Sequence, residues 1–293
     1  MKFPYYPGCT LKAQAKNFEI SALTTCAYLG IELEELDKWN CCGTVYSLAT
    51  DDLMKQVAPI RVLIRAMEKG QNELVTLCAM CYNTLARANL LVRADEEKME
   101  KLNCFMDDEP DYDGSVRVLH LLQVLKDIIG FEIIMQKVVR PLKGLRVSPY
   151  YGCLLIRPKG VAIDDPRDPR ILEDLLSALG ADVIGTPERA TCCGSYLTID
   201  RKEVVADNAY RIIMTSVERG AELLVTSCPL CFFNLDSRQK EAKKLHPEMK
   251  QVPIVYFTQL MALAFGLEDS LGFESHYVDP RPFLKEKGLL GGS

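Results

Sequence analysis

Residues 73–81 read ELVTLCAMC, and residues 222–231 read ELLVTSCPLC. Each stretch begins with a short apolar run, which is typical of a buried strand, and ends in two cysteines separated by two residues. We expect a helix directly after Cys78, and Pro229 next to Cys228 suits the first turn of a helix. The two stretches therefore predict a strand, a cysteine pair and a helix, in the same order twice.

The repetition extends through the whole chain. Each half has a single cysteine, then Cys-Cys-Gly, then the Cys-x2-Cys pair, separated by 31 and 35 residues in the first half and by 38 and 34 in the second. Tyr6 and Gly8 also match Tyr150 and Gly152. The simplest explanation is duplication of a unit of about 145 residues, with one domain at residues 1–143 and a second at residues 144–293. The repeated cysteines are Cys9, Cys41, Cys42, Cys78, Cys81, Cys153, Cys192, Cys193, Cys228 and Cys231.

Apolar patterns predict alternating strands and helices in both units. Such alternation is typical of parallel α/β sheets, so we expect two duplicated, Rossmann-like α/β domains related by a pseudo-two-fold axis. In the first unit we expect strands at residues 2–6, 32–36 and 73–77 and helices at residues 12–29 and 51–69. In the second unit we expect strands at residues 145–150, 182–184 and 223–226 and helices at residues 169–179 and 201–219.

The cysteines follow the predicted strands closely in both units. Because the carboxyl ends of parallel strands meet at one edge of a sheet, we expect each set of five to gather there. Helix N-termini at that edge supply backbone N–H groups, which lower the pKa of a thiol. Gly43 and Gly194 would let the backbone approach a bound group closely. Cys26 and Cys104 have no counterpart in the other unit, so we exclude them from the ligands.

The composition is that of a globular protein in a reducing compartment. Hydrophobic residues make up 48% of the 293 residues and charged residues 26%, and no apolar run is long enough for a membrane span. The N-terminus lacks the apolar core of a signal peptide, so we expect a cytoplasmic protein. Twelve cysteines in that compartment favour metal binding over disulfides. The net charge of −5 predicts no general attraction to nucleic acid or anionic lipid.

The number of cysteines favours iron and sulfur over zinc. Structural zinc takes four ligands, whereas each unit has five repeated cysteines and the whole chain has three histidines. Two adjacent cysteines fit a single tetrahedral ion poorly but can reach neighbouring irons of a cluster. We therefore expect one iron–sulfur cluster per unit. Zinc binding and uncoordinated thiols stay open as alternatives.

The same motifs point to a known family. Pro7-Gly8-Cys9, the two Cys-Cys-Gly motifs and the two Cys-x2-Cys pairs make the chain resemble the cysteine-rich CCG-domain family over essentially its whole length. With two such domains and no further module, it is similar to heterodisulfide reductase B subunits. The resemblance implies two noncubane [4Fe-4S] clusters, one per domain, which are themselves the catalytic groups.

The resemblance also implies an activity and partners. The expected enzyme reduces the disulfide of coenzyme M and coenzyme B to two thiols in methanogenesis, with one electron from each cluster. Its electrons would come from the heterodisulfide reductase C subunit, an iron–sulfur protein, and from the A subunit, which carries flavin and iron–sulfur clusters and which a hydrogenase or formate dehydrogenase would supply. Two clusters at one cleft suit this reaction, because disulfide reduction takes two electrons and a cluster passes one.

Residues outside the cysteine sets are assigned less directly. The heterodisulfide carries sulfonate, phosphate and carboxylate groups, so Lys12, Arg157 and Lys159 near the first cysteine of each set are candidate substrate contacts. The alternative is that each is a solvated charge in a surface loop, without a role in binding. His120 is a candidate proton donor, with a structural role as the alternative. His276, in a C-terminal tail that we expect to be extended, should lie at the surface.

Two other functions stay open. The first is an iron–sulfur subunit of another oxidoreductase, for lactate or glycolate oxidation or for thiol-dependent fumarate reduction, whose subunits resemble this chain in the CCG domains. The second is a zinc-binding scaffold without redox chemistry. Iron and acid-labile sulfide in the purified protein would eliminate the scaffold.

Overall fold

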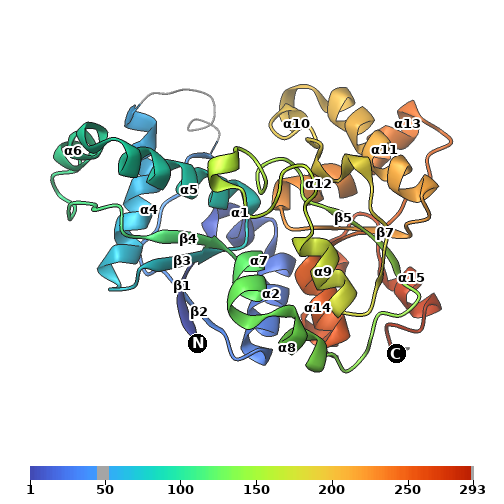
Figure 1. Ribbon diagram of the computed structural model, residues 1–293. Coiled ribbons are helices and arrows are strands. Elements are labelled where there is room, and N and C mark those ends of the chain that lie inside the picture. Colours follow the sequence, from blue (N-terminus) through green and yellow to red (C-terminus); the bar gives the residue numbers. More distant parts are fainter. Residues whose placement is uncertain (45–52, 292–293) are drawn as a thin grey trace.

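The structure is a computed structural model that describes residues 1–44 and 53–291, and it contains two parallel four-stranded sheets (Figure 1). The strand order is β2-β1-β3-β4 in the first sheet and β6-β5-β7-β8 in the second, so one topology occurs twice. The predicted class of two duplicated, Rossmann-like α/β halves is confirmed. The strands are β1 (Lys2–Tyr6), β2 (Glu32–Glu35), β3 (Glu73–Thr76), β4 (Arg117–His120), β5 (Arg146–Tyr150), β6 (Asp182–Val183), β7 (Leu223–Thr226) and β8 (Ile254–Tyr256).

Helices flank both sheets (Figure 1). In the first half they are α1 (Gly8–Ala13), α2 (Lys16–Tyr28), α4 (Val57–Glu68), α5 (Ala79–Ala94), α6 (Glu96–Phe105), α7 (Leu121–Gln123) and α8 (Phe131–Gln136). In the second half they are α9 (Ile171–Ala178), α10 (Leu197–Asp200), α11 (Lys202–Glu218), α12 (Pro229–Asp236), α13 (Gln239–Leu245), α14 (Phe257–Ala264) and α15 (Arg281–Glu286). Short helical turns are η1 (Leu53–Gln56), η3 (Lys159–Val161), η4 (Pro187–Ala190), η5 (Glu268–Ser270), η6 (Phe273–Ser275) and the π-helix η2 (Val124–Ile129). Within the described part of the chain, none of these helices has the length and apolar character needed to span a bilayer.

Two of the expected helices differ in their course. The helix expected at residues 12–29 is interrupted between α1 and α2, because the N–H groups of Gln14 and Ala15 both bond to the carbonyl oxygen of Thr10, at 2.8 and 2.9 Å. The helix expected at residues 51–69 begins with residues 51 and 52, which lie outside the described part of the chain. From residue 53 onward it consists of η1 followed by α4.

The C-terminal tail is folded rather than extended. It contains η6 and α15, and its residue His276 is only 9% exposed, so the expected surface position is wrong. Gln259 Nε2 lies 2.9 Å from His276 Nε2, and Phe232 and Phe273 pack edge-on against the imidazole ring. The tail therefore closes over the end of the second half.

The central strands are buried on both faces. Leu74 and Val75 in β3 have no exposed surface, and all four residues of β7 are buried. Parallel strands that helices cover on both faces have this continuous apolar character. The short apolar runs that end in cysteines therefore form the middle of each sheet.

The last strand of each sheet ends at an equivalent residue. His120 ends β4 and Tyr256 ends β8, each beside the threonine that ends the neighbouring strand. Each also begins the helix that follows, with its backbone N–H donated to the side chain of Gln123 at 3.0 Å or Gln259 at 2.9 Å. His120 and Tyr256 thus occupy the same position in the two halves.

The two halves pack through reciprocal pairs of helices. Helix α2 of the first half packs against α14 of the second, and α9 of the second packs against α8 of the first. At the first contact Phe18 stacks on Tyr256 with ring centroids 4.2 Å apart, and Ser21 Oγ lies 2.7 Å from Thr258 Oγ1. A two-fold relation between similar halves produces such reciprocal contacts. The division of the chain between residues 143 and 144 stays a prediction.

Candidate metal centre

The repeated cysteines lie near the carboxyl ends of the strands in both halves. One follows β1 or β5, two lie in the loop after β2 or β6, and two lie at the start of α5 or α12. Because parallel strands point the same way, this arrangement brings five thiols to one edge of each sheet. In this order the residues are Cys9, Cys41, Cys42, Cys78 and Cys81 in the first half and Cys153, Cys192, Cys193, Cys228 and Cys231 in the second.

The Cys-x2-Cys pairs begin helices. Cys78 and Cys228 are the N-cap residues of α5 and α12, with an extended backbone. Interaction with the thiols of Cys228 and Cys81 holds the pKa of Cys78 well below its ordinary value. The pKa of Cys228 is instead raised to about 12, because the lowering effect of Cys231 is outweighed by the raising effects of Cys78 and of burial. The N-terminus of a helix stabilises negative charge through its unpaired N–H groups and its dipole. The first pair therefore holds one sulfur, that of Cys78, where a thiolate is favoured.

In the first half the sulfurs form contacting pairs. Cys9 Sγ lies 3.8 Å from Cys41 Sγ, and Cys42 Sγ lies 3.7 Å from Cys81 Sγ. Cys9 and Cys41 are exposed, whereas Cys42 and Cys81 are buried. The set therefore extends from the surface into the interior.

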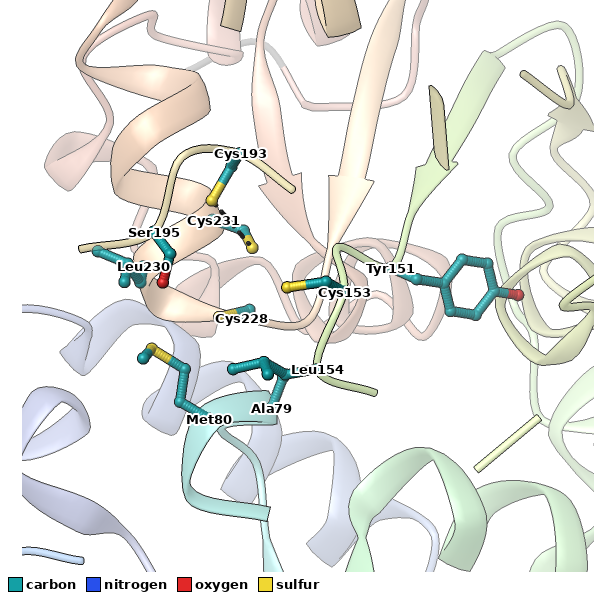
Figure 2. A pocket seen from close by; sticks show the side chains of 10 residues that line it. All are labelled: Ala79, Met80, Tyr151, Cys153, Leu154, Cys193, Ser195, Cys228, Leu230 and Cys231. Carbon is teal, nitrogen blue, oxygen red and sulfur yellow. Dashed lines mark hydrogen bonds between the residues drawn. The ribbon is translucent and has the colours of Figure 1, made fainter. Parts of the chain in front are cut away.

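The second half repeats this arrangement. Cys193 Sγ lies 3.6 Å from Cys231 Sγ, and the neighbouring thiols of Cys153 and Cys192 shift each other's pKa in opposite directions. Asn234 Nδ2 in α12 donates to Cys193 Sγ at 3.4 Å. Figure 2 shows Cys153, Cys193 and Cys231 around one small pocket.

The two cysteine sets meet where the halves adjoin. The thiol of Cys78 lies close enough to that of Cys228, its counterpart in the other half, for each to shift the pKa of the other. Equivalent residues contact each other only close to the axis that relates two halves. Ala79 and Met80, which follow Cys78, line the pocket of the second set (Figure 2). The ten cysteines therefore form one continuous site across both halves.

Close packing moves the pKa values of neighbouring thiols in opposite directions. Hydrogen bonding with Cys41, and then with Cys81, holds the pKa of Cys42 well below its ordinary value. The hydrogen bond to Cys42 in turn raises the pKa of Cys81. In the second set, hydrogen bonds from neighbouring thiols, first that of Cys153, lower the pKa of Cys192 to about 2. Thiolates are therefore favoured at Cys42 and Cys78 in the first set and at Cys192 in the second, and ionising their neighbours as well requires nearby positive charge.

This set of donors suits a metal cluster. All twelve cysteines are free thiols, and thiolates are soft ligands that suit iron–sulfur clusters and zinc. Within residues 1–44 and 53–291, no three side chains of His, Cys, Asp or Glu are arranged to hold a single metal ion. The sulfurs instead occur as contacting pairs along each sheet edge.

Two glycines make room for sulfur at this site. Gly8 and Gly152 precede the first cysteine of each set and have φ angles of +71° and +66°. A Cβ atom at Gly8 would lie 2.8 Å from Cys81 Sγ, and one at Gly152 would lie 2.9 Å from Cys231 Sγ. Glycine is thus required here for both its conformation and its small size.

The glycines of the Cys-Cys-Gly motifs have other neighbours. A Cβ atom at Gly194 would lie 2.8 Å from Val205 Cγ2 in α11, and one at Gly43 would lie 3.5 Å from Ala58 Cβ in α4. These glycines therefore let the cysteine loops pack against the next helix. The close approach to a bound group that we expected for them stays a prediction.

Two tyrosines hold the loops that carry the adjacent cysteines. Tyr6 Oη donates to the carbonyl oxygen of Asn40 at 2.9 Å, and Tyr150 Oη donates to that of Thr191 at 2.6 Å. Each acceptor directly precedes a Cys-Cys-Gly motif. Burial and the nearby cysteines raise the pKa of both tyrosines, which therefore remain donors. The sequence analysis assigns these tyrosines no role, although their repetition at equivalent positions is a signal that could have indicated one.

The sequence matches the CCG family of cysteine-rich domains over residues 3–86 and 147–236. These two ranges contain all ten of the repeated cysteines. The chain belongs to the CCG family.

Named CCG relatives match the chain over almost its whole length. The 8-methylmenaquinol:fumarate reductase membrane anchor subunit of Wolinella succinogenes is 32% identical, covering 95% of this chain and 97% of that one. A protein of Archaeoglobus profundus that is named as like the heterodisulfide reductase B subunit is 27% identical and covers 92% of each chain. The B subunit of the ferredoxin:CoB-CoM heterodisulfide reductase of Methanosarcina mazei is 25% identical, covering 97% of this chain and 96% of that one. The similarity to heterodisulfide reductase B subunits that the motifs predicted is confirmed.

A solved structure shares the fold. The crystal structure of a hypothetical protein from Helicobacter pylori superimposes with a TM-score of 0.74 at 12% identity. The match covers 94% of this chain and 51% of the other, so the chain spans about half the length of that protein. This likeness supports the fold alone.

The three candidate substrate cations of this CCG protein have different surroundings. Lys12 Nζ forms ion pairs with Glu19 at 2.8 Å and with Glu35 at 2.6 Å, so its charge is already compensated. Arg157 Nη1 donates to the carbonyl oxygen of Ala190 at 3.0 Å, and Lys159 is exposed in η3. Their role as substrate contacts stays a prediction.

His120 is buried and fully hydrogen-bonded. Its Nε2 lies 2.8 Å from the carbonyl oxygen of Leu77, and its Nδ1 accepts the backbone N–H of Leu122 at 3.2 Å. Burial lowers the pKa of His120 to about 4, so the ring is neutral near pH 7. This geometry favours the structural alternative, in which the ring caps α7, over a proton donor.

The two unrepeated cysteines lie elsewhere. Cys26 is 1% exposed inside α2, and burial raises its pKa to about 12. Cys104 is exposed near the end of α6. Neither is part of the contacting pairs described above, which fits their exclusion from the ligands.

The helix that follows each cysteine pair faces the other half. For the first of these helices, α5, hydrogen bonds close the contact between the two halves. Helix α5 packs against residues 154–161, and this contact is termed the sealed side. Tyr82 Oη donates to the carbonyl oxygen of Val161 at 3.0 Å. Asn83 Nδ2 donates to the carbonyl oxygens of Leu154 and Arg157, both at 2.7 Å.

The equivalent region of the second half contains a cavity and is termed the open side. The cavity measures about 820 Å³ and separates α12 from Thr10, Gln14 and Ala15. Met80, Ser195 and Leu230 line both this cavity and the small cysteine pocket of Figure 2. The open side therefore adjoins the cysteine site and is large enough for a small-molecule substrate.

Proposed function

We propose that this chain is an iron–sulfur subunit of a multi-subunit oxidoreductase, with one cluster in each half. The observation that carries the proposal is the proximity of Cys78 to Cys228, which brings two five-cysteine sets together beside a cavity. Ten thiol ligands without a single-ion arrangement among the described residues favour iron–sulfur clusters over the zinc scaffold. The printed names of the CCG relatives support an oxidoreductase complex.

All ten repeated cysteines are assigned as ligands in this proposal. When bound, the clusters would supply one-electron transfer, and the noncubane type that the resemblance implies is part of the proposal. The chain's own residues prepare the site: the N-cap Cys78 favours a thiolate, and Tyr6 and Tyr150 fix the loops of the adjacent cysteines. Helices on both sheet faces exclude water from the inner thiols.

The first candidate reaction is reduction of the coenzyme M–coenzyme B heterodisulfide. It takes two electrons and two protons and yields two thiols, and a site shared by two one-electron groups suits it. The names of the heterodisulfide reductase relatives support this reaction. The C and A subunits that the resemblance implies would be the partners in this case. The compensated charge of Lys12 does not add support, because a substrate with sulfonate and phosphate groups needs free cations.

The second candidate is electron transfer in a quinol-linked fumarate reductase, and the open-side cavity favours it. Among the described residues that line the cavity, none is Lys, Arg or His. An anionic substrate placed there would lose its hydration without gaining a paired charge, whereas a neutral quinol would not. The Wolinella succinogenes relative, at 32% identity, has this activity in its name.

Anaerobic purification of the whole chain tests the cluster proposal. We expect a brown protein with about eight irons and an equal amount of acid-labile sulfide for two four-iron clusters. Stoichiometric zinc without sulfide would contradict the proposal. With iron confirmed, oxidation of reduced methyl viologen by the heterodisulfide is compared with reduction of the clusters by a quinol. The substrate that reacts identifies the candidate reaction.

A further inference from the structure

Tyr256 has a buried hydroxyl group without a partner. Its side chain has no exposed surface, and within residues 1–44 and 53–291 its Oη makes no hydrogen bond. The ring lies between Phe18 and Phe232, with centroid separations of 4.2 and 4.4 Å, and it lines the open-side cavity. A buried hydroxyl without a partner is destabilising. A ligand oxygen in the cavity would remove that penalty by accepting the hydrogen bond.

At the equivalent position of the sealed side, the buried polar atoms are paired. His120 occupies the place of Tyr256 there, and both of its ring nitrogens have hydrogen-bond partners. Tyr82 replaces Phe232 and bonds to the carbonyl oxygen of Val161. The unpaired donor therefore belongs to the side of the molecule that also contains the cavity.

The lining of the cavity indicates the chemical class of its ligand. Tyr196, Phe232, Phe233 and Tyr277 supply aromatic surface, which suits a flat ring. The carboxylate that lines the cavity, Asp236, already accepts the backbone N–H groups of residues 277 and 278, at 2.6 and 3.1 Å. With no cation among the described lining residues, the site suits a neutral ligand that accepts a hydrogen bond.

We propose that the open-side cavity binds a neutral, flat ring of the quinone class, with one ring oxygen accepting a hydrogen bond from Tyr256 Oη. Phe232, which stacks on Tyr256, and Phe233 form the wall against which the ring packs. The rim is apolar and accessible, because Tyr196 is 39%, Ile199 84% and Tyr277 47% exposed. An apolar substituent of the ring would cover this surface. The inference rests on the second candidate of the proposed function, a quinol-linked reaction at this cavity, and adds the residues that would hold the ring.

Calorimetric titration of the anaerobic, metal-loaded chain with menadione, a small naphthoquinone, tests the proposal. We expect saturable binding of one menadione per chain. Tyr256→Phe removes only the donor and should weaken binding about fivefold to tenfold. Phe233→Glu places a charge against the ring and should abolish measurable binding. Tyr82→Phe removes the equivalent hydroxyl from the sealed side and should leave menadione affinity unchanged.

The outcomes separate this inference from the proposed function. Iron and sulfide are determined in the same samples, so iron-loaded protein that does not bind menadione overturns the inference and leaves the iron–sulfur assignment intact. Protein without iron that still binds menadione, with loss in Tyr256→Phe, supports the inference and overturns the assignment. Equal affinity in wild type, Tyr256→Phe and Phe233→Glu also overturns the inference, because binding would then be elsewhere. Far-ultraviolet circular dichroism of each variant checks that the fold is retained.

Discussion

The two halves share a sheet order and a cysteine set, but they differ in the segment after the first cysteine. In the first half, α2 begins at Lys16, which is 7 positions after Cys9. In the second half, α9 begins at Ile171, which is 18 positions after Cys153. The longer segment reaches across to the first half and packs on α5. The shorter one leaves space in front of α12, and this space is the open-side cavity.

The residues after each cysteine pair have adapted to this difference. On the sealed side, Tyr82 and Asn83 donate hydrogen bonds to the carbonyl oxygens of the long segment. On the open side, the same positions hold Phe232 and Phe233, which line the cavity. A duplicated fold thus has similar ligand sets in both halves, while access to those sets is provided on one side. The cysteine sets are therefore similar in the two halves, whereas the space available for a substrate differs between them.

The largest expected effect concerns the equivalence of the two cysteine sets. Cys81→Ser and Cys231→Ser each remove one ligand from one half, so each should lose about half of the iron and acid-labile sulfide. The remaining cluster should keep its electron paramagnetic resonance signal. Iron analysis and spectroscopy of the two variants measure this directly.

Cys104→Ser is the matched control, since Cys104 is exposed and lies outside both sets. It should retain the iron of the wild type. Loss of all iron in both ligand variants would break the comparison, because it would mean that one cluster needs both halves. The contact between Cys78 and Cys228 makes that alternative outcome worth separating from the expected one.

A smaller effect should distinguish the sealed side by its response to acid. Burial lowers the pKa of His120 to about 4 from the ordinary 6.5, so the folded protein binds this proton less well than the unfolded chain. The stabilisation is therefore present above pH 6.5 and is lost as the pH falls toward 4. Between pH 7 and pH 5 the loss should be about 2 kcal/mol. The open side has no such dependence at this position, because the pKa of Tyr256 is raised.

Urea unfolding at pH 7 and pH 5 measures the acid effect, with His120→Gln as the comparison. Buried His276, whose pKa burial also lowers to about 4, contributes in both proteins and cancels in the difference. The variant should lose less stability than the wild type over this range. An unchanged pH dependence in His120→Gln would show that His120 is not responsible.

The next effect should be similar in both halves. It tests whether the space beside a cysteine sulfur requires glycine. Gly8→Ala and Gly152→Ala would place a Cβ atom within 2.8 and 2.9 Å of a cysteine sulfur. Gly30→Ala and Gly220→Ala share the positive φ but meet nothing within 4 Å, so they report the backbone strain alone. We expect the first pair to be less stable than the controls by about 1.5 kcal/mol and to hold less iron. Equal losses in all four variants would mean that the sulfurs can move aside freely.

Much of the fold could be predicted because its signals are local. The strand expected at residues 223–226 is β7, since a short apolar run before a cysteine is a strong pattern. The break between α1 and α2 could not be predicted, because Gln14 and Ala15 are ordinary helix residues and the interruption comes from bonds to Thr10. The burial of His276 depends on how the tail docks onto Phe232, which is a tertiary contact.

The candidate site also has some features that the sequence predicts and others that it does not. The gathering of the cysteines at the sheet edges follows from strand order, which the alternating pattern predicts. The contact between Cys78 and Cys228 depends on how the two halves dock, and no local pattern encodes it. The open side depends on a difference in segment length whose consequence appears only in three dimensions. The position of Lys12 after Cys9 makes it a candidate substrate contact, but its acidic partners, Glu19 and Glu35, come from later elements of the chain.

The smallest expected effect comes from exchanging the two residues that follow the cysteine pairs. Tyr82→Phe removes one buried hydrogen bond from the sealed side and should lower the free energy of unfolding by about 1 kcal/mol. Phe232→Tyr adds a hydroxyl beside the open-side cavity, where water can reach it, and should change stability by less than about 0.5 kcal/mol. Urea unfolding of both variants and of the wild type at one pH measures the difference. If the two exchanges had equal effects, hydrogen bonding would not be what closes the sealed side, and the length of segment 154–161 alone would account for the asymmetry.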